Sequence, residues 1–290
     1  MDSGGLVPST EKALGKRLQE ARQAAGLTQQ QLCHKANLSF STLAKIERGA
    51  IKSPSIFTIQ AIANALGSGL DDLLGVVSPA LAPRKLHKTK GGASFIYFDL
   101  NDCLVRGSHQ AYSRLAEASG RPIDVVETAF WRYYDDAWRG KMSVKDFNAA
   151  LAKKLNLSKV DWTREYMAAI EPVTEVQELL KWAAGLYKVG ILTNIISGQV
   201  KALREQGVLP NIHYDAIVDS SEVGTIKPEE KMYQIAQERA GCPPEEILLI
   251  DDTRANLMAA EKMGWHVLWF DGYHPEESAN RIREALEPAD

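Results

Sequence analysis

Cysteine is scarce in this 290-residue sequence, and the three that occur are far apart. Cys33, Cys103 and Cys242 form no CxxC or Cys/His group, which argues against a disulfide framework or a zinc site and favours a reducing, cytoplasmic location. Long apolar runs are missing as well, since none approaches the roughly 18 to 20 residues that cross a bilayer. The first residues also lack the basic and apolar regions of a signal peptide. We therefore expect neither a membrane-spanning nor a disulfide-stabilised protein.

Charge is distributed unevenly along the chain. Residues 1–90 carry 12 Lys and Arg against 6 Asp and Glu, about +6, whereas the rest carries 22 against 31, about −9. The overall composition, 45% hydrophobic and 24% charged, is typical of a globular chain long enough for two domains. The basic first part is therefore the one expected to meet a polyanion.

Residues 10–75 show short helical patterns separated by capping and turn residues. A threonine or serine that can serve as an N-cap precedes four of these patterns: Thr10, Thr28, Ser39 and Ser55. A fifth, shorter pattern covers residues 70–74. The segment therefore predicts an all-α domain of five short helices.

Within this domain, GLTQQQLCHKANLSFSTLAKIERG resembles the helix-turn-helix of the Cro/phage-repressor (XRE-like) family of bacterial regulators. The resemblance covers nearly all of residues 11–75. In that family the second helix of the motif enters the major groove of double-stranded DNA, and two copies bind neighbouring half-sites. The resemblance therefore implies operator DNA as a partner and a homodimer. The residues it places at the DNA are Gln29, Ser39, Phe40, Ser41, Thr42 and Lys45.

Other roles stay open for several of these side chains. Gln29 either contacts a backbone phosphate or braces the reading helix, and Ser39 also suits an N-cap. Lys45 and Arg48 otherwise lie on a solvated face, and Glu47 is expected to hold the bundle together. Binding of a protein partner is an alternative role for the whole domain.

Residues 76–93 contain two prolines, two adjacent glycines and a basic cluster without helical or strand period, so they predict a linker. Its basic side chains either add non-specific phosphate contacts or belong to a solvated tether: Arg84, Lys85, Lys88 and Lys90.

Residues 94–275 alternate between β-type runs and helical patterns. The apolar runs are 94–99, 188–193, 215–219, 246–250 and 266–270. This alternation predicts an α/β domain with a doubly wound parallel sheet. The long stretch after the first run reads as helix throughout, so a helical cap at about 108–172 is expected over the carboxyl edge of the sheet. Residues 276–290 are expected to form a solvated helical tail.

The cap carries four aromatic residues near helical spacing that are expected to form its core: Phe130, Tyr133, Tyr134 and Trp138. Arg132 and Arg139 either reach a substrate or lie on the surface.

Polar side chains gather where the predicted strands end or where a loop enters a helix: Asp99, Thr193, Asn194, Lys227, Asp251 and Asp252. In an open parallel sheet, ligands bind at the carboxyl ends of the strands. Clustered carboxylates need a cation such as Mg²⁺, and a lysine beside them offsets the charge of a bound phosphate. The pattern therefore predicts a phosphoryl-transfer site.

The same residues resemble the haloacid dehalogenase superfamily, most of whose members are phosphatases with a covalent aspartyl intermediate. The resemblance covers about 94–272 and is strongest in ILTN, EVGTIKPEEKMYQIA and ILLIDDTRANLMAAEKMGWHVLWF. The last stretch looks like the branch with a small helical cap, which acts on sugar phosphates and related metabolites. Asp99 matches the nucleophile, Thr193 and Asn194 the phosphate-binding pair, and Lys227 the lysine that steadies the phosphoryl oxygens.

By the same resemblance, Asp251 and Asp252 hold Mg²⁺ directly or through water, together with Asp99 and the backbone carbonyl of Asn101. The resemblance also places Asn256 at this site. The expected catalytic residues are Asp99, Asn101, Thr193 and Lys227.

The chain departs from the family at Asn101. The phosphatases have Asp-x-Asp, and the second Asp protonates the leaving group and later activates water. An amide cannot exchange a proton near neutral pH, so a factor of about 10² to 10⁴ in rate is lost. Some branches of the superfamily, notably the dehalogenases, have another residue here, which weakens hydrolysis without excluding it. Asp102 is expected to point away from the substrate unless the loop rearranges, and Cys103 is expected to pack in the core.

Three functions follow from these patterns. The first is a DNA-binding regulator whose second domain senses a phosphorylated metabolite with Mg²⁺ and with weak or no hydrolysis. The second is a working phosphatase with an attached helix-turn-helix. The third is a second domain that serves as a dimerisation or docking body.

Overall fold

The computed structural model describes residues 11–51, 53–66 and 86–289. The chain divides into two units, residues 1–83 and 84–290. Among the described residues, no helix is long and apolar enough to cross a membrane.

The first unit is helical. Its described helices are α1 (Glu11–Ala24), α2 (Gln29–Ala36), α3 (Phe40–Glu47) and α4 (Ile56–Leu66). Thr28 caps α2 in a capping box with Gln31, and Ser39 caps α3, as expected of hydroxyl side chains at these positions. Between them, Asn37 has the left-handed conformation, with φ of 51°, that makes the turn tight. The helix predicted at residues 70–74 lies outside the described residues.

The second unit is built on a five-stranded parallel sheet in the order β5-β4-β1-β6-β7. Its strands are β1 (Phe95–Phe98), β4 (Lys188–Thr193), β5 (Ala216–Asp219), β6 (Ile247–Asp251) and β7 (His266–Trp269). The predicted doubly wound sheet is confirmed. The chain runs outward from β1 to β4 and β5, then returns past β1 to β6 and β7. The reversal of strand order lies beside β1, where such sheets bind ligands.

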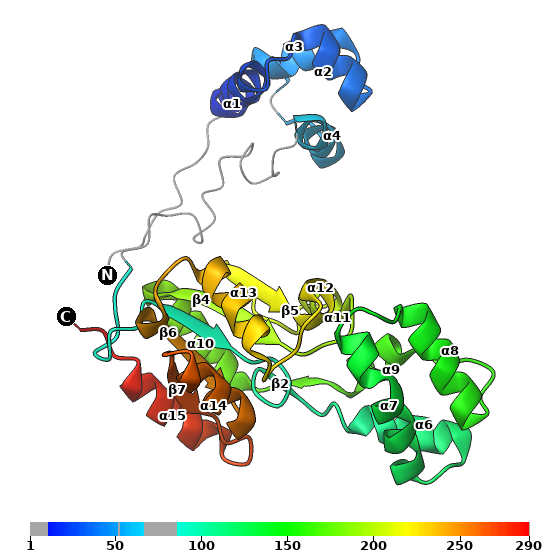
Figure 1. Ribbon diagram of the computed structural model, residues 1–290. Helices are drawn as coiled ribbons and strands as arrows, with labels where there is room; N and C mark the ends of the chain where they lie inside the picture. The colour runs from blue at the N-terminus through cyan, green and yellow to red at the C-terminus, as the bar shows by residue number, and fades with distance from the viewer. Residues whose placement is uncertain (1–10, 52, 67–85, 290) are drawn as a thin grey trace. The chain divides into compact units, whose positions relative to one another are not determined.

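Helices cover both faces of the sheet (Figure 1). Buried side chains of α10 (Thr174–Leu186), α11 (Gln199–Glu205) and α15 (Pro275–Ala285) share one core with β1 residues Ile96 and Phe98. Buried side chains of α13 (Glu230–Ala240) and α14 (Arg254–Lys262) share the other core with Phe95 and Tyr97. Successive residues of β1 thus face opposite cores, as the period of a strand requires. Two shorter elements, α12 (Ser220–Val223) and η1 (Pro244–Glu246), lie in the connections.

Both ends of the predicted second domain are more firmly attached than the sequence suggested. The prediction of a solvated tail was wrong, because Ile282 and Leu286 are fully buried. The Tyr187 hydroxyl donates to the Leu286 carbonyl. The end of the predicted linker also joins this unit, since Lys90 N–H donates to the Glu287 carbonyl at 3.0 Å and Lys88 pairs with Glu246. Arg84 and Lys85 lie outside the described residues.

We expect Ile282→Ala to lower the free energy of unfolding of the second unit by about 2–4 kcal/mol, because it leaves a cavity under α15. Urea unfolding of the full chain measures this loss. Glu284→Ala, which changes an exposed residue of the same helix, is the control. Equal stability of Ile282→Ala and the native chain would mean that α15 is not part of the fold.

The cap consists of α6 (Gln110–Ser119), α7 (Ile123–Trp138), α8 (Val144–Leu155) and α9 (Trp162–Ala169), drawn in green in Figure 1. A short antiparallel ribbon of β2 (Val105–Arg106) and β3 (Glu171–Pro172) joins it to the sheet domain. The prediction of helix throughout this insertion was therefore wrong at its two ends. Strands of two residues are too short to show a period of two in the sequence.

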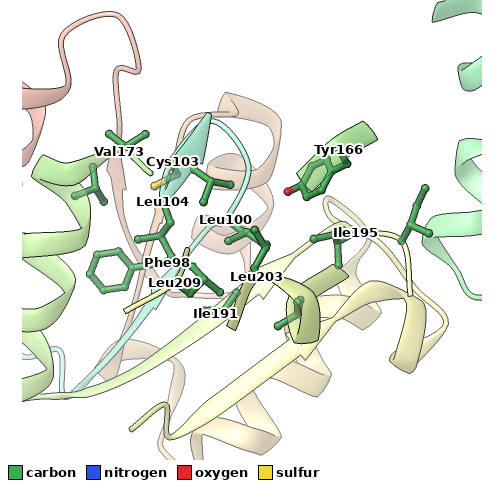
Figure 2. Close-up of a cluster of buried hydrophobic side chains, with 14 of the residues drawn as sticks. Phe98, Leu100, Cys103, Leu104, Tyr166, Val173, Ile191, Ile195, Leu203 and Leu209 are labelled. Atoms are coloured by element: carbon green, nitrogen blue, oxygen red, sulfur yellow. The ribbon is translucent and has the colours of Figure 1, made fainter. Parts of the chain in front are cut away.

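The loop after β1 closes the core beneath the cap attachment. Figure 2 shows Phe98, Leu100, Cys103 and Leu104 among the buried apolar side chains of this region. Cys103 is fully buried, as predicted.

Candidate functional site

A buried lysine links two carboxylates at the carboxyl edge of the sheet. Lys227 Nζ lies 2.7 Å from Asp99 Oδ1 and 2.6 Å from Asp251 Oδ2. Asp99 follows β1 and Asp251 ends β6, and these neighbouring strands pair Phe98 with Ile250, so the two aspartates stand side by side. The parallel sheet thus brings together residues that are more than 100 positions apart. Burial favours the neutral amine, but both carboxylates together raise the pKa of Lys227 above its ordinary value.

Asp251 is held in place by the start of α14. Its Oδ1 accepts from the Thr253 N–H at 2.8 Å and from Asn256 Nδ2 at 3.0 Å. Asn256 lines the same cavity as Asp99, so it lies where the sequence placed it. Its amide orients a carboxylate of the site.

Three carboxylates converge next to Lys227. One oxygen each of Asp99, Asp251 and Asp252 can be chosen so that all lie within 4.8 Å of one another. Burial raises the pKa of Asp99 well above its usual range, and burial together with Asp251 raises the pKa of Asp252 to about 6. Both shifts show that negative charge is poorly solvated here, and a divalent cation with oxygen ligands relieves that cost.

The residues that end β4 have different roles in the structure. The Thr193 hydroxyl is fully buried and has no hydrogen-bond partner within the described part of the chain. Asn194 forms a reciprocal pair with the backbone of Lys227: its Nδ2 donates to the Lys227 carbonyl at 2.9 Å, and its Oδ1 accepts from the Lys227 N–H at 2.8 Å. The amide of Asn194 therefore fixes the lysine, although Asn194 also lines the cavity.

The Asn101 side chain is anchored by the cap. The Tyr166 hydroxyl, on α9, donates to Asn101 Oδ1 at 2.6 Å, while Asn101 Nδ2 lies 3.4 Å from the Asn194 carbonyl. In Figure 2 this hydroxyl lies on the side of the Tyr166 ring that faces the segment with Leu100. Burial raises the pKa of Tyr166 and keeps the phenol protonated. At the position of the family's acid–base aspartate, this chain thus presents a fixed amide.

A cavity of about 390 Å³ connects this edge of the sheet with the cap. Asp102, an exposed residue, is among the residues that line it. All four cap aromatics belong to the cap core or pack on it, as predicted, and Phe130 and Trp138 also line the cavity. Helical spacing marked the apolar stripe but not which of its members border a cavity.

The cap contacts the sheet domain through an ion pair at the end of α7. Arg139 Nη2 lies 2.6 Å from Glu229 Oε1, and the same guanidinium pairs with Asp135. Gly140 follows with φ of +65°, and a Cβ there would lie 2.1 Å from the Ser221 carbonyl oxygen. Arg139 therefore holds the cap, and neither it nor the exposed Arg132 is among the cavity-lining residues that the structure describes.

In the first unit, a buried ion pair connects α1 with α3. Arg22 Nε lies 2.7 Å from Glu47 Oε1, and Gln29 Nε2 donates to Glu47 Oε2 at 2.8 Å. Glu47 thus holds the bundle together, as predicted. The contact of Gln29 agrees with the bracing role that the sequence left open.

The other predicted DNA contacts lie at the first two turns of α3. The Ser39 hydroxyl accepts from the Thr42 N–H at 3.1 Å and lies 3.1 Å from the Ser41 hydroxyl. Phe40 is half exposed and Lys45 is exposed. Ser39 and Ser41 are also exposed, whereas Thr42 is half-buried.

Fold and site together define a helical module of the DNA-binding type, joined to a parallel-sheet domain with a helical cap and an aspartate-lysine site. Residues 95–264 match the family model of haloacid dehalogenase-like hydrolases, and residues 18–73 match a helix-turn-helix model. The chain belongs to the haloacid dehalogenase-like hydrolase family and carries an XRE-type helix-turn-helix domain.

Curated relatives resemble one unit or the other. Pyrimidine 5'-nucleotidase YjjG of Escherichia coli is 31% identical over 108 residues, which are 37% of this chain and 48% of that protein. The immunity repressor protein of Bacillus phage phi105 is 45% identical over 62 residues, 21% of this chain and 42% of the repressor. The matched segments thus span less than half of either relative.

Solved structures resemble the second unit in fold. A predicted HAD-like hydrolase from Porphyromonas gingivalis has a TM-score of 0.54 and 22% identity, covering 62% of this chain and 92% of that one. The enzyme bt-2542 from Bacteroides thetaiotaomicron, solved in complex with magnesium and inorganic phosphate, has a TM-score of 0.50 and 17% identity, covering 62% and 96%. Both likenesses concern the fold alone.

Proposed function

We propose that this protein is a DNA-binding transcription regulator whose second domain senses a phosphorylated small metabolite together with Mg²⁺, with weak or no hydrolysis. The observation that carries the proposal is the Asn101 amide, fixed by the Tyr166 hydroxyl at 2.6 Å where a phosphatase needs an acid–base group. The rest of the site is assembled, because Asp99, Lys227 and Asp251 are in direct contact. Such a site favours binding over turnover.

Mg²⁺ fits the residues present. The carboxylates of Asp99, Asp251 and Asp252, with the backbone carbonyl of Asn101, would hold it, and the bound ion would neutralise charge on the phosphate. The unpartnered Thr193 hydroxyl and the Lys227 ammonium are suited to the phosphate oxygens. That bt-2542 was solved with magnesium and phosphate supports this assignment.

The first unit would bind operator DNA as part of a cytoplasmic homodimer, with Ser39, Phe40, Ser41, Thr42 and Lys45 at the DNA. A ligand in the second unit would change DNA binding only if its affinity differs between two arrangements of the dimer.

A thermal-shift screen of phosphorylated metabolites with Mg²⁺, on the native chain and on Asp99→Asn, tests the sensor. We expect a ligand that raises the melting temperature of the native chain and loses this effect in the variant. Fluorescence anisotropy with DNA from upstream of its own gene, with and without that ligand, then measures the coupling. Failure of every phosphate compound would contradict the proposal and favour a docking body.

A working phosphatase is the second candidate. The contact of Asp99 with Lys227 and the similarity to a nucleotidase both favour it. Rapid hydrolysis of a phosphate monoester by the native chain would favour this function over the sensor.

We expect Lys45→Ala to weaken binding to all DNA sequences and to reduce the slope of log affinity against log salt by about 1, because one phosphate contact is lost. Anisotropy titrations at several salt concentrations measure the slope. Lys231→Ala, an exposed lysine of α13 in the second unit, is the control. An unchanged slope would remove Lys45 from the DNA contacts.

A further inference from the structure

The cavity that contains Asp99 and Lys227 is walled on the cap side by aromatic rings. These are Tyr112, Phe130, Trp138, Trp162 and Tyr166. The rings also pack on one another: the centroids of Phe130 and Trp162 are 4.5 Å apart, and Tyr112 stacks on Trp162 at 5.4 Å. Mutual packing fixes the orientation of these walls before a ligand arrives. Preformed aromatic walls bind flat, apolar groups.

Charge limits what this cavity accepts. Among its lining residues in the described ranges, Lys227 is the one lysine or arginine, and its ammonium already contacts Asp99 and Asp251. Asp102 and Asp252 add further negative charge to the wall. One phosphate together with a cation is therefore accommodated, whereas a second anionic group would meet only carboxylates.

Gln199 supplies an unused hydrogen-bond donor. This first residue of α11 lines the cavity and is 2% exposed, and its Oε1 accepts from the Ile196 N–H at 3.2 Å. Its Nε2, however, has no hydrogen-bond partner within the described chain. By contrast, Gln177, which is also buried, donates from its Nε2 to two carbonyls, those of Leu104 and Val208. A buried amide N–H without a partner costs free energy, which a ligand acceptor would recover.

Building on the proposed function, we propose that this cavity binds a phosphate monoester whose organic part is a flat, uncharged ring with a hydrogen-bond acceptor, as in a nucleoside monophosphate. The phosphate lies at Thr193 and Lys227. The ring lies against the cap aromatics, and its carbonyl or ring nitrogen accepts from Gln199 Nε2. Gln199 and Trp138 are then residues that select the ligand.

Isothermal titration of the full-length protein in Mg²⁺ with uridine monophosphate, ribose 5-phosphate and inorganic phosphate tests this. We expect uridine monophosphate to bind at least about tenfold more tightly than ribose 5-phosphate, since stacking on the ring adds to phosphate binding. Trp138→Leu should reduce that preference about fivefold. Trp131→Leu, on the same helix but exposed and outside the cavity lining, should leave it unchanged.

Gln199→Glu is the second variant, because a carboxylate still accepts from the Ile196 N–H but no longer donates. We expect it to reduce the ratio of the affinities for uridine monophosphate and ribose 5-phosphate about tenfold. The added charge acts on the phosphate of both compounds, so its effect cancels in this ratio. If Trp138→Leu does not fold, this variant decides alone. Ribose 5-phosphate binding as tightly as uridine monophosphate, or a ratio that Gln199→Glu leaves unchanged, would overturn the inference and leave the sensor intact. Absence of uridine monophosphate binding would also overturn the inference, whereas failure of every compound in the thermal-shift screen would overturn the proposed function.

Discussion

Asn101→Asp is expected to raise the rate of phosphate monoester hydrolysis by about 10²- to 10⁴-fold, because it restores the missing acid–base group to an otherwise assembled site. The substitution is nearly isosteric, and the new carboxylate still accepts the hydrogen bond that the Tyr166 hydroxyl donates at 2.6 Å. Release of inorganic phosphate in Mg²⁺, with a ligand found in the thermal-shift screen, measures the gain.

Two control variants isolate the cause of this gain. Asn101→Ala removes the amide without adding a carboxylate and should not raise the rate. Asp99→Asn combined with Asn101→Asp should abolish the gain, because the nucleophile is lost. If the native chain already turns over as fast as Asn101→Asp, its function is hydrolysis. Asp102→Asn then shows whether that cavity-lining carboxylate has taken the acid–base role.

Lys227→Met should be the most destabilising single change at the site. It leaves Asp99 and Asp251 buried side by side without their shared cation, which costs about 3–5 kcal/mol of unfolding free energy. For a domain of this size the melting temperature should fall by roughly 6–20 °C at pH 8. Differential scanning calorimetry of the full chain measures the shift.

The loss of unfolding free energy in Lys227→Met, relative to the native chain, should become smaller as the pH falls from 8 to 5. Burial raises the pKa of Asp99 well above its unfolded value, and the Lys227 charge is the largest effect that opposes this rise. A carboxyl with a raised folded pKa favours the folded state at low pH and opposes it as pH rises, so the variant recovers stability in acid. Lys231→Met, at an exposed lysine, is the control. A loss that is independent of pH would mean that lost packing, not charge, is the cause.

Much of the architecture was predictable because it depends on local pattern. Strands buried on both faces read as continuous apolar runs, and β4 begins and ends at its predicted residues, 188 and 193. Thr28 and Ser39 marked the starts of α2 and α3 because a helix leaves N–H groups that a hydroxyl satisfies. The grouping of the polar residues at the strand ends was also predictable, because the carboxyl ends of parallel strands lie at one edge of the sheet.

The pairing of polar groups was not predictable in the same way. Asn194 matched a phosphate-binding position, yet both atoms of its amide hold the backbone of Lys227. Gln199 and Tyr166 belong to helical patterns that carry no sign of a site. The tail was predicted to be solvated because charged residues dominate its sequence, although Ile282 and Leu286 belong to a buried apolar face.

The sequence by itself determined two domains, a helix-turn-helix, a parallel sheet and the amide at position 101, because periodicity, capping and residue type are local properties. Tertiary structure alone decided that Tyr166 fixes this amide, that Gln199 keeps an unpaired donor, and that aromatic rings wall the cavity. These contacts join residues from separate elements, and their partners are set by how the cap and the sheet pack.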